Sequence, residues 1–269
     1  MSTPLLELRN VTKIFGSKSD YTVALDDMTL VLDEYFPKII AVVGESGSGK
    51  TTTGMLLLGF YGPTMGQALF RGKPLQELKG ADLFRFRREV QAVFQDPFAV
   101  YNPFYKVDNL LSIPIKNFKL ARSKAEAREL MEDALERVGL RPEETLGRYP
   151  HQLSGGLKQK VNIGRALLLN KPLLLLDEPF QNIDVNTRVS YIRSITERRK
   201  EEGFTMILIT HNLREALLFA DRLVFFGPKP ARIVGEWLVK RPPDQSFRSF
   251  DWLFEEERKV VALFPEFMI

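Results

Sequence analysis

Residues 38–51 constrain the fold of this chain more than any other segment. Lys38-Ile-Ile-Ala-Val-Val-Gly44 is a short run rich in β-branched residues that ends at a glycine, as expected of a buried parallel strand entering a loop. Gly44-Glu-Ser-Gly-Ser-Gly-Lys50-Thr51 follows at once, and residues 51–58 have helical character. The order of strand, glycine-rich loop and helix fits the pattern G-x-x-x-x-G-K-[ST], which is typical of a loop that binds phosphate.

The residue types in this loop suit a triphosphate. Gly44, Gly47 and Gly49 permit positive φ angles and a close approach of the backbone, so that successive amides can face phosphate oxygens. The helix that begins near Lys50 adds the positive end of its dipole. We expect Lys50 to reach the β- and γ-phosphates and the hydroxyl of Thr51 to bind Mg²⁺. The other residues predicted to line this nucleotide site are Glu45, Ser46, Ser48 and Thr52.

A second segment supplies carboxylates. Leu173-Leu-Leu-Leu-Asp177-Glu178-Pro179 is a hydrophobic strand that ends in two acidic residues. Alone it could be a core strand with a solvated acidic turn. Beside a phosphate loop the functional interpretation is favoured, because another strand must bring an acid to the metal. Asp177 is then predicted to hold Mg²⁺, and Glu178 to orient or deprotonate the attacking water as general base.

The rest of the chain alternates between strands and helices, which indicates a parallel sheet. Residues 96–114 read as a loop, because Pro97, Pro103 and Pro114 interrupt them. A capping box at Ser123 predicts a helix up to Gly139. Further strands are expected at residues 5–11, 23–32, 68–70, 90–94, 206–210 and 222–226, and a glycine-led helix at residues 153–169.

Composition limits the class of protein. Hydrophobic residues make up 44% and charged residues 27% of the chain, which argues against disorder. There are no cysteines, so disulfides and thiolate metal sites are excluded. No apolar stretch approaches the ~20 residues that a membrane helix needs, so we expect a soluble chain whose membrane role requires a partner. The net charge of +4 is read as ordinary surface charge.

Leu153-Ser154-Gly155-Gly156, followed by a helix, is a second small anion-binding turn. With the phosphate loop before it and the acidic strand after it, the chain resembles the ATP-binding cassette (ABC) transporter family, whose signature segment reads Leu-Ser-Gly-Gly-Gln. The resemblance implies that Ser154, Gly155 and Gly156 bind the γ-phosphate of ATP held by the opposite subunit. Two such sites form only in a head-to-tail dimer.

Other family elements then match by position. Gln95 matches the glutamine that touches Mg²⁺ and the attacking water and links to the membrane partner. Asp184 matches the aspartate of the dimer-contact loop, and His211 the switch histidine that contacts the γ-phosphate. Phe15 lies where the family places an aromatic residue that stacks on adenine, with Tyr21 as the alternative. The catalytic set is therefore Glu178, His211 and Gln95; the metal set is Thr51, Gln95 and Asp177.

The resemblance implies a fold and an organisation. The fold class is α/β, a P-loop NTPase (RecA-like) parallel sheet with an N-terminal antiparallel β-subdomain and an inserted α-helical subdomain. We expect the ATPase domain at residues 1–241, with the helical insertion at about 96–164, and an aromatic-rich C-terminal extension at residues 242–269. The aromatic residues of that extension could pack on their own domain or on a partner; packing on the domain itself is the favoured alternative.

Segments around Phe94–Phe98 and Arg148–Gly156 resemble the ATPases of oligopeptide and dipeptide importers, and related systems carry nickel complexes or oligosaccharides. The implied partners are two membrane-spanning permease subunits, an extracellular solute-binding protein, and either a second copy or a second ATPase. The implied location is the cytoplasmic face of the cell membrane. Leu157 replaces the usual glutamine of the signature, and Gln181-Asn-Ile-Asp184 departs from the commoner Ser-Ala-Leu-Asp.

Two other functions compete with a transport ATPase. A soluble cassette ATPase that acts on nucleic acid or ribosomes would carry coiled-coil insertions or two cassettes in one chain, and the sequence has neither sustained heptads nor a second phosphate loop. No nucleic acid partner is therefore expected. A catalytically silent scaffold that binds ATP would be expected to lack the general base or the switch histidine, whereas Glu178 and His211 are both present.

Overall fold

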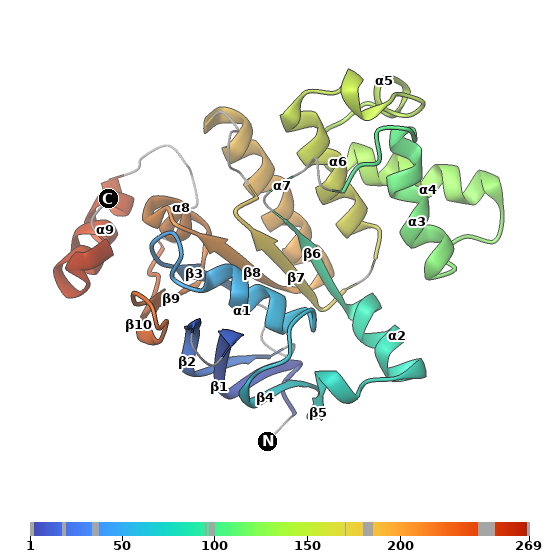
Figure 1. Cartoon of the computed structure of the whole chain (residues 1–269). Coiled ribbons are helices and arrows are strands. Elements are labelled where there is room, and N and C mark those ends of the chain that lie inside the picture. The colour runs from blue at the N-terminus through green and yellow to red at the C-terminus, as the bar shows by residue number, and fades with distance from the viewer. Residues whose placement is uncertain are drawn as a thin grey trace. The chain divides into compact units, whose positions relative to one another are not determined.

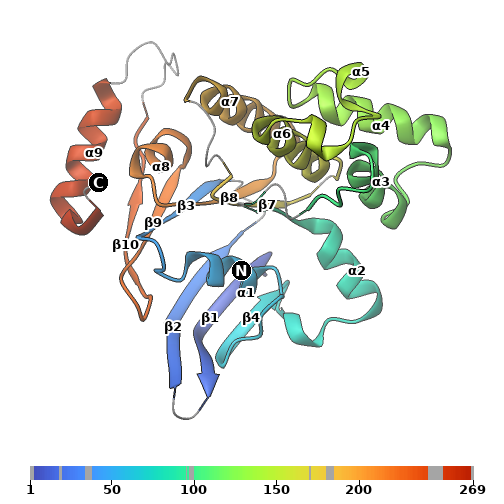
Figure 2. The same cartoon turned by 45° about the horizontal axis from the view of Figure 1, so that its top comes forward.

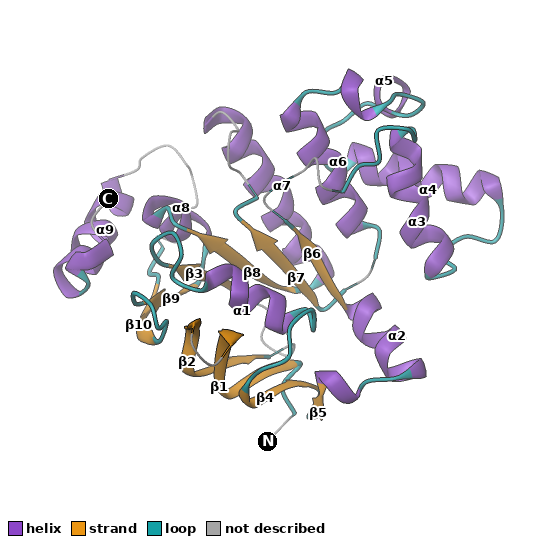
Figure 3. Ribbon diagram, viewed as in Figure 1, coloured by secondary structure: helices purple, strands orange, loops and turns teal. Residues whose placement is uncertain are grey.

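The computed structural model describes residues 3–17, 20–33, 38–94, 96, 100–169, 171–179, 185–241 and 251–267 (Figure 1). The chain divides into two compact units. The first comprises Met1–Phe86 with Phe204–Ile269, and the second comprises Arg87–Gly203. Figure 3 shows that both units contain helices and strands.

The first unit opens with an antiparallel sheet in the strand order β2-β1-β4-β5. Leu8 of β1 pairs with Leu30 of β2, and Leu6 pairs with Phe70 of β4, so apolar residues of three strands share one buried face. This sheet is the antiparallel β-subdomain expected from the sequence. Its strands are β1 (Leu6–Ser17), β2 (Asp20–Leu32), β4 (Met65–Phe70) and β5 (Lys73–Pro74).

β3 (Ile39–Val43) is the central parallel strand of the first unit, and all of its residues are buried. β3 pairs in parallel with β8 (Thr205–Thr210) on one side and with β9 (Arg222–Phe226) on the other. β10 (Ile233–Leu238) adds to β9 in the antiparallel direction. Because β3 is covered on both faces, its sequence is continuously apolar and does not alternate. The helices of this unit are α1 (Lys50–Leu57), α8 (Leu213–Phe219) and α9 (Asp251–Leu263), and α2 (Gly80–Glu89) begins in it.

The C-terminal helix α9 lies beside α8 in both views (Figure 2). Beyond α9, the ring of Phe264 stacks on Phe225 of β9 with centroids 4.5 Å apart, and the ring of Phe267 packs against Phe225 at a tilt, with centroids 4.9 Å apart. The indole nitrogen of Trp237 in β10 donates a 3.0 Å hydrogen bond to the buried carboxylate of Glu256. The described part of the C-terminal extension therefore packs on its own domain, the alternative favoured from the sequence.

The second unit contains a parallel pair of strands, β6 (Val90–Val93) and β7 (Leu173–Asp177), in which Val93 pairs with Leu176. Helices make up most of the remainder. α4 begins at Ser123, whose hydroxyl accepts a 3.1 Å bond from the amide of Glu126, so the predicted cap is confirmed. The helices are α3 (Val107–Asn117), α4 (Lys124–Glu136), α5 (Pro142–Thr145), α6 (Gly155–Leu167) and α7 (Val185–Glu202).

The prediction of a loop throughout residues 96–114 is wrong for its second half, where α3 forms. α3 includes Pro114 within the helix. The helix is stable because Val107, Leu111 and Ile115 are all buried on one face, and burial of such a face outweighs the single backbone hydrogen bond that a proline cannot donate.

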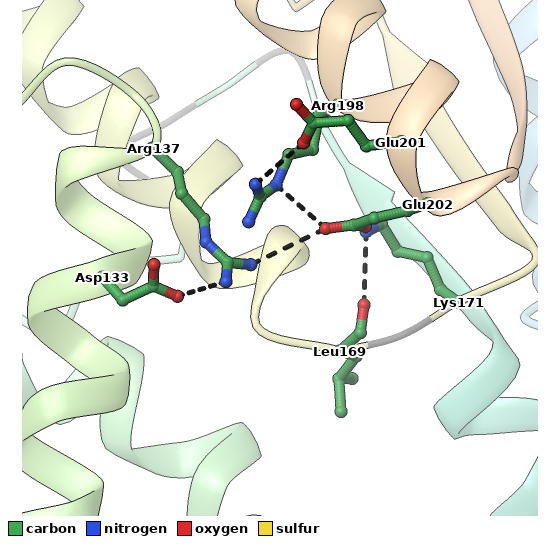
Figure 4. Close-up of polar contacts among 7 residues, drawn as sticks. All are labelled: Asp133, Arg137, Leu169, Lys171, Arg198, Glu201 and Glu202. Atoms are coloured by element: carbon green, nitrogen blue, oxygen red, sulfur yellow. Dashed lines mark hydrogen bonds and ion pairs between the residues drawn. The ribbon is translucent and has the colours of Figure 1, made fainter.

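A partly buried ionic cluster joins three segments of the second unit (Figure 4). Oε1 of Glu202, in the last turn of α7, lies 2.9 Å from Nε of Arg198 and 3.6 Å from Nη1 of Arg137 at the end of α4. Its other oxygen lies 3.6 Å from Nζ of Lys171, just before β7. Nζ of Lys171 also donates a 3.2 Å hydrogen bond to the carbonyl of Leu169. One carboxylate thus meets three cations.

Burial of Lys171 makes the stability of the protein depend on pH. Loss of solvation lowers the pKa of Lys171 from 10.5 to about 8; Glu202 opposes this change, and Arg198 and Arg137 add to it. Between pH 8 and 10.5 the unfolded chain therefore binds the proton that the folded chain has released, so stability from this group rises with pH.

We expect the free energy of unfolding of the wild type to rise relative to Lys171→Met as pH increases from 7.5 to 10.5, by up to about 3 kcal/mol. Urea denaturation of both proteins at each pH measures the difference, and the variant serves as the control for every other titrating group. A difference that stays constant across this range would contradict the lowered pKa.

Candidate functional site

The phosphate loop has the conformation that its glycines predict. β3 ends at Val43, and the loop turns through Gly47 and Gly49, which have φ angles of 81° and 84°. A side chain at Gly49 would lie 2.8 Å from Leu25 and 3.0 Å from the carbonyl of Ala24, so only glycine fits there without strain. Among the described residues no side chain caps the first amides of α1, which leaves these amides available to an anion.

Lys50 lies inside this loop. The residue is 4% exposed, and its ammonium donates hydrogen bonds of 2.7 Å to the carbonyls of both Gly44 and Glu45. The Oγ of Ser48 lies 3.4 Å away. The next residue, Thr51, is exposed. The loop therefore presents a fixed positive charge, backbone amides and an accessible hydroxyl within one short segment, which is the donor set that a phosphate chain and its metal require.

His211 belongs to the same unit and follows β8. Since Val43 pairs with Thr210 in the parallel register, His211 and Gly44 emerge at the same edge of the sheet. The turn that carries His211 is fixed on both sides. The amide of Asn212 donates to the hydroxyl of Thr210 at 3.1 Å, and the Asn212 side chain accepts from the amide of Glu215 at 2.9 Å. His211 itself is exposed, so its imidazole is accessible to a ligand at this edge.

The two carboxylates lie in the second unit. Asp177 is the last residue of β7 and is 3% exposed. Glu178 follows it with a φ of 44°, in the left-handed region that residues other than glycine rarely occupy. Strain of this kind is concentrated at functional positions. The structure thus brings the two acids to the end of the predicted strand, with a fixed backbone for the residue predicted to act as base.

The signature turn also lies in the second unit. Ser154 is the N-cap of α6, and its hydroxyl accepts a 3.3 Å hydrogen bond from the amide of Leu157. Ser154 and Gly155 are exposed, and a side chain built on Gly155 or Gly156 would meet nothing within 4 Å. Leu157, where the signature usually has glutamine, is 36% exposed. The turn is therefore accessible from solvent at Ser154 and Gly155, as a site for another molecule requires.

Phe15 lies near the end of β1 and is 37% exposed. Its ring packs edge-on against Tyr61, with centroids 5.4 Å apart. The ammonium of Lys13 lies 5.0 Å from the Phe15 centroid and donates a 2.8 Å hydrogen bond to the carbonyl of Gly62. Tyr21, the alternative adenine-stacking residue, is 63% exposed. Phe15 and Tyr21 are both accessible for stacking on adenine, and the ring of Phe15 packs against Tyr61 and Lys13.

Two predicted site residues, Gln95 and Asp184, lie outside the described residues. The part of the chain that the structure does describe holds no group of three or more His, Cys, Asp and Glu residues suited to a metal ion. Sequence reasoning missed Lys13 and Tyr61, which lie beside Phe15. It also missed Gln159, whose side-chain amide donates a hydrogen bond to the carbonyl of Pro179, the residue after Glu178. A lysine two residues before an aromatic residue is the only sequence signal for any of these, and it is weak.

The chain was compared with known proteins. A family model described as ABC transporter matches residues 26–181. The oligopeptide transport ATP-binding protein OppF of Bacillus subtilis is 34% identical over 230 residues, which are 84% of this chain and 74% of that protein. OppF of Streptococcus mutans is also 34% identical, over 81% of this chain and 70% of its own length.

Solved structures of ABC transporter cassettes are also similar to this chain. The ATP-binding cassette MJ0796, determined as a dimer in a post-hydrolysis state with ADP and Pi, has a TM-score of 0.77 and 27% identity, over 88% of this chain and all of that one. The cbiO1 protein of Clostridium perfringens, part of the cbiONQ transporter complex, has a TM-score of 0.73 and 25% identity, over 98% and 96% of the two chains.

These findings confirm the predicted fold class and resemblance. None of the helices in the described ranges is long and apolar enough to cross a membrane. The structure places the phosphate loop after β3, the two acidic residues at the end of β7 and the signature turn at the start of α6, as the sequence predicts. The chain therefore belongs to the ABC transporter family, as an ATP-binding and ATP-hydrolysing subunit.

Proposed function

We propose that this chain is the ATPase of an oligopeptide importer, and that each of its ATP molecules is bound between the phosphate loop of one cassette and the Ser154 turn of another. The observation that carries this proposal is the exposed signature turn on the same chain as a fully formed phosphate loop. The phosphate loop of the chain already binds one nucleotide. A second anion-binding turn on the same chain is therefore best explained if it binds the nucleotide of a neighbouring molecule.

The residues of the chain have distinct roles in this proposal. The amides from Gly44 to Lys50 and the ammonium of Lys50 hold the phosphates, while Phe15 stacks on the base. Glu178 accepts a proton from the attacking water, and His211 donates a hydrogen bond to the γ-phosphate. Gln95 orients the same water, and Asp184 contacts the partner cassette. Glu45, Ser46, Ser48, Thr52, Gly155 and Gly156 complete the nucleotide contacts.

The donor set fits Mg²⁺. The exposed hydroxyl of Thr51, the carboxylate of Asp177 and the amide oxygen of Gln95 are hard oxygen ligands of the type that Mg²⁺ prefers. Few protein ligands are needed, because Mg²⁺ takes its remaining ligands from phosphates and water. When bound, the ion neutralises charge on the β- and γ-phosphate oxygens. Asp177, Thr51 and Gln95 would hold the ion, and the ion would supply positive charge to the phosphates.

The relatives support the proposed cargo and partners. Proteins similar in sequence to this chain are named for oligopeptide transport or peptide import. We assign two permease subunits, an extracellular solute-binding protein and a second cassette, identical or different, as partners, and the cytoplasmic face of the membrane as the location. The exposed aromatic residues Phe104 and Tyr105, 86% and 55% exposed, suit contact with a permease. The domain assignment stays as read from the sequence, with a helical subdomain at about 96–164 within the second unit.

Reconstitution with the permease and binding protein in lipid vesicles tests this proposal. We expect phosphate release from ATP to fall to background when EDTA removes Mg²⁺, because the ion supplies positive charge at the phosphates during their transfer. Binding protein loaded with an oligopeptide should raise the rate. Equal stimulation by binding protein loaded with a single sugar would contradict the peptide assignment, and turnover that persists in EDTA would contradict the metal set.

A further inference from the structure

A single side chain links the catalytic carboxylate to the signature turn of the same chain. Gln159 lies in α6 and is 3% exposed. Its Nε2 donates a 2.8 Å hydrogen bond to the carbonyl of Pro179, the residue after Glu178. This bond joins α6 to the loop that follows β7 across 20 positions of sequence.

The orientation of the Pro179 carbonyl depends on the backbone conformation of Glu178. Glu178 holds a φ of 44°, and Pro179 is buried and has a fixed φ of its own. Because the φ of Pro179 is restrained, a movement of the Glu178 backbone is passed to the Pro179 carbonyl unless rotation about ψ of Pro179 compensates for it. Gln159 is the side chain that holds this carbonyl in place, so it acts on the general base through the backbone.

The other end of the link is the Ser154 turn. Gln159 follows Ser154 by five positions in sequence, on the same helix, so the two are about 7.5 Å apart along the helix axis. Two further bonds hold α6 to its unit. The hydroxyl of Tyr101 donates to the carbonyl of Lys158 at 2.9 Å, and Nη2 of Arg165 donates to the carbonyl of Ala92 at 2.7 Å. A helix is stiff along its axis, so displacement of its second turn moves its N-terminus as well.

The side-chain amide of Gln159 uses its donor and leaves its acceptor unpaired. Its Oε1 is buried and has no hydrogen-bond partner among the described residues. A buried acceptor without a donor carries a free-energy cost, which any rearrangement of the loop after Glu178 that supplies a donor would relieve. A donor bond to the loop after Glu178, beside an acceptor that a shift of this loop could satisfy, makes Gln159 sensitive to the position of that loop.

We infer that Gln159 is a positioning residue that passes the state of Glu178 at one ATP site to the signature turn that completes the other ATP site. This inference rests on the proposed head-to-tail dimer. Hydrolysis beside Glu178 shifts the Pro179 carbonyl, Gln159 carries the shift into α6, and the Ser154 turn loosens its hold on the partner's nucleotide. The two sites are then coupled through each chain and not only across the interface.

Replacement of Gln159 by methionine tests the link, because methionine keeps the length and volume of the side chain and removes the donor. The matched control is Gln91→Met in β6, where Nε2 likewise donates to a backbone carbonyl, that of Arg87 at 2.6 Å, and which belongs neither to α6 nor to the segment after β7. We expect Gln159→Met to lower kcat about 10-fold or more and to reduce the Hill coefficient for ATP from about 2 to about 1, and Gln91→Met to change neither.

A second measurement does not depend on turnover. Amide hydrogen exchange of residues 153–168 in the full chain should slow when ATP and Mg²⁺ are added to the Glu178→Gln protein. The same protein with Gln159→Met should lose this protection while it still binds ATP. If ATP turnover is too slow for a Hill coefficient to be measured, the hydrogen-exchange result by itself tests the inference. Equal exchange and equal kinetics in the presence and absence of the Gln159 amide would overturn the inference and leave the proposed function untouched.

The variant Gln159→Glu separates positioning from simple loss of packing. A protonated carboxyl group can donate to the Pro179 carbonyl, whereas an ionised one repels it. The kcat of Gln159→Glu relative to the wild type should therefore recover as pH falls, and that of Gln159→Met should not. A defect in Gln159→Glu that does not change with pH would assign the residue a packing role only and contradict the link.

Discussion

Glu178→Gln is expected to lower ATP turnover by about 10²–10⁴-fold while ATP-bound dimers still form. The amide has the shape of the carboxylate and cannot accept the proton of the attacking water. The strained backbone at Glu178 and the buried Asp177 beside it stay in place, so nucleotide binding is retained. Phosphate release under steady-state conditions measures the first effect, and gel filtration with ATP and Mg²⁺ measures the second.

The control for lost charge is Glu77→Gln. Glu77 is an exposed carboxylate in the short 3₁₀ helix after β5, within the first unit, and no role at the nucleotide is assigned to it. Its turnover should equal that of the wild type. Glu178→Gln protein that hydrolyses ATP at a rate similar to the wild type would remove Glu178 from the catalytic set and leave the general base to another residue.

The second large effect is expected from two variants that are inactive alone and active together. Lys50→Ala removes the ammonium that bridges Gly44 and Glu45, and with it the charge that holds the phosphates. Ser154→Arg places a bulky cation on the exposed turn, where it blocks approach to a partner's nucleotide. Each change should reduce phosphate release to background. The loss of the Ser154 cap costs only about 1 kcal/mol, so the chain still folds.

A mixture of the two variants should regain activity. In a mixed head-to-tail dimer one site carries both defects and the other carries none, so an equal mixture should reach up to about one quarter of wild-type phosphate release. Two different affinity tags, one on each variant, show that mixed dimers are present. Mixed dimers that form and stay inactive would contradict the idea that Ser154 serves the nucleotide of a neighbouring chain.

Local signals explain how much of the structure could be predicted. β3, the phosphate loop and α1 are contiguous in sequence. Gly47 and Gly49 adopt positive φ angles, and a side chain at Gly44 would lie too close to Ser48 and Phe226, so pattern alone identified this segment. The same holds for β7 with Asp177 at its end. These segments gave the fold class and most of the nucleotide site.

Sequence patterns predicted less well those features that depend on contacts between residues far apart in the chain. α3 was read as loop, because its proline was weighed without the apolar face that stabilises it. The contact between Gln159 and Pro179 left no trace in composition or spacing, because a glutamine in a helix is ordinary until a tertiary neighbour supplies its acceptor. Position within a motif could suggest Phe15, but only three dimensions reveal that Lys13 and Tyr61 brace it.

The packing of Phe264 has a consequence for how this chain can vary. The Phe264 ring lies so close to Gly235 of β10 that even a methyl group at position 235 would overlap it. A glycine in an edge strand otherwise weakens pairing and is poorly suited to its place. Gly235 and the C-terminal helix are therefore interdependent: a shorter cassette that ends after β10 is free to carry a β-branched residue at this position, and a cassette that keeps the helix is not.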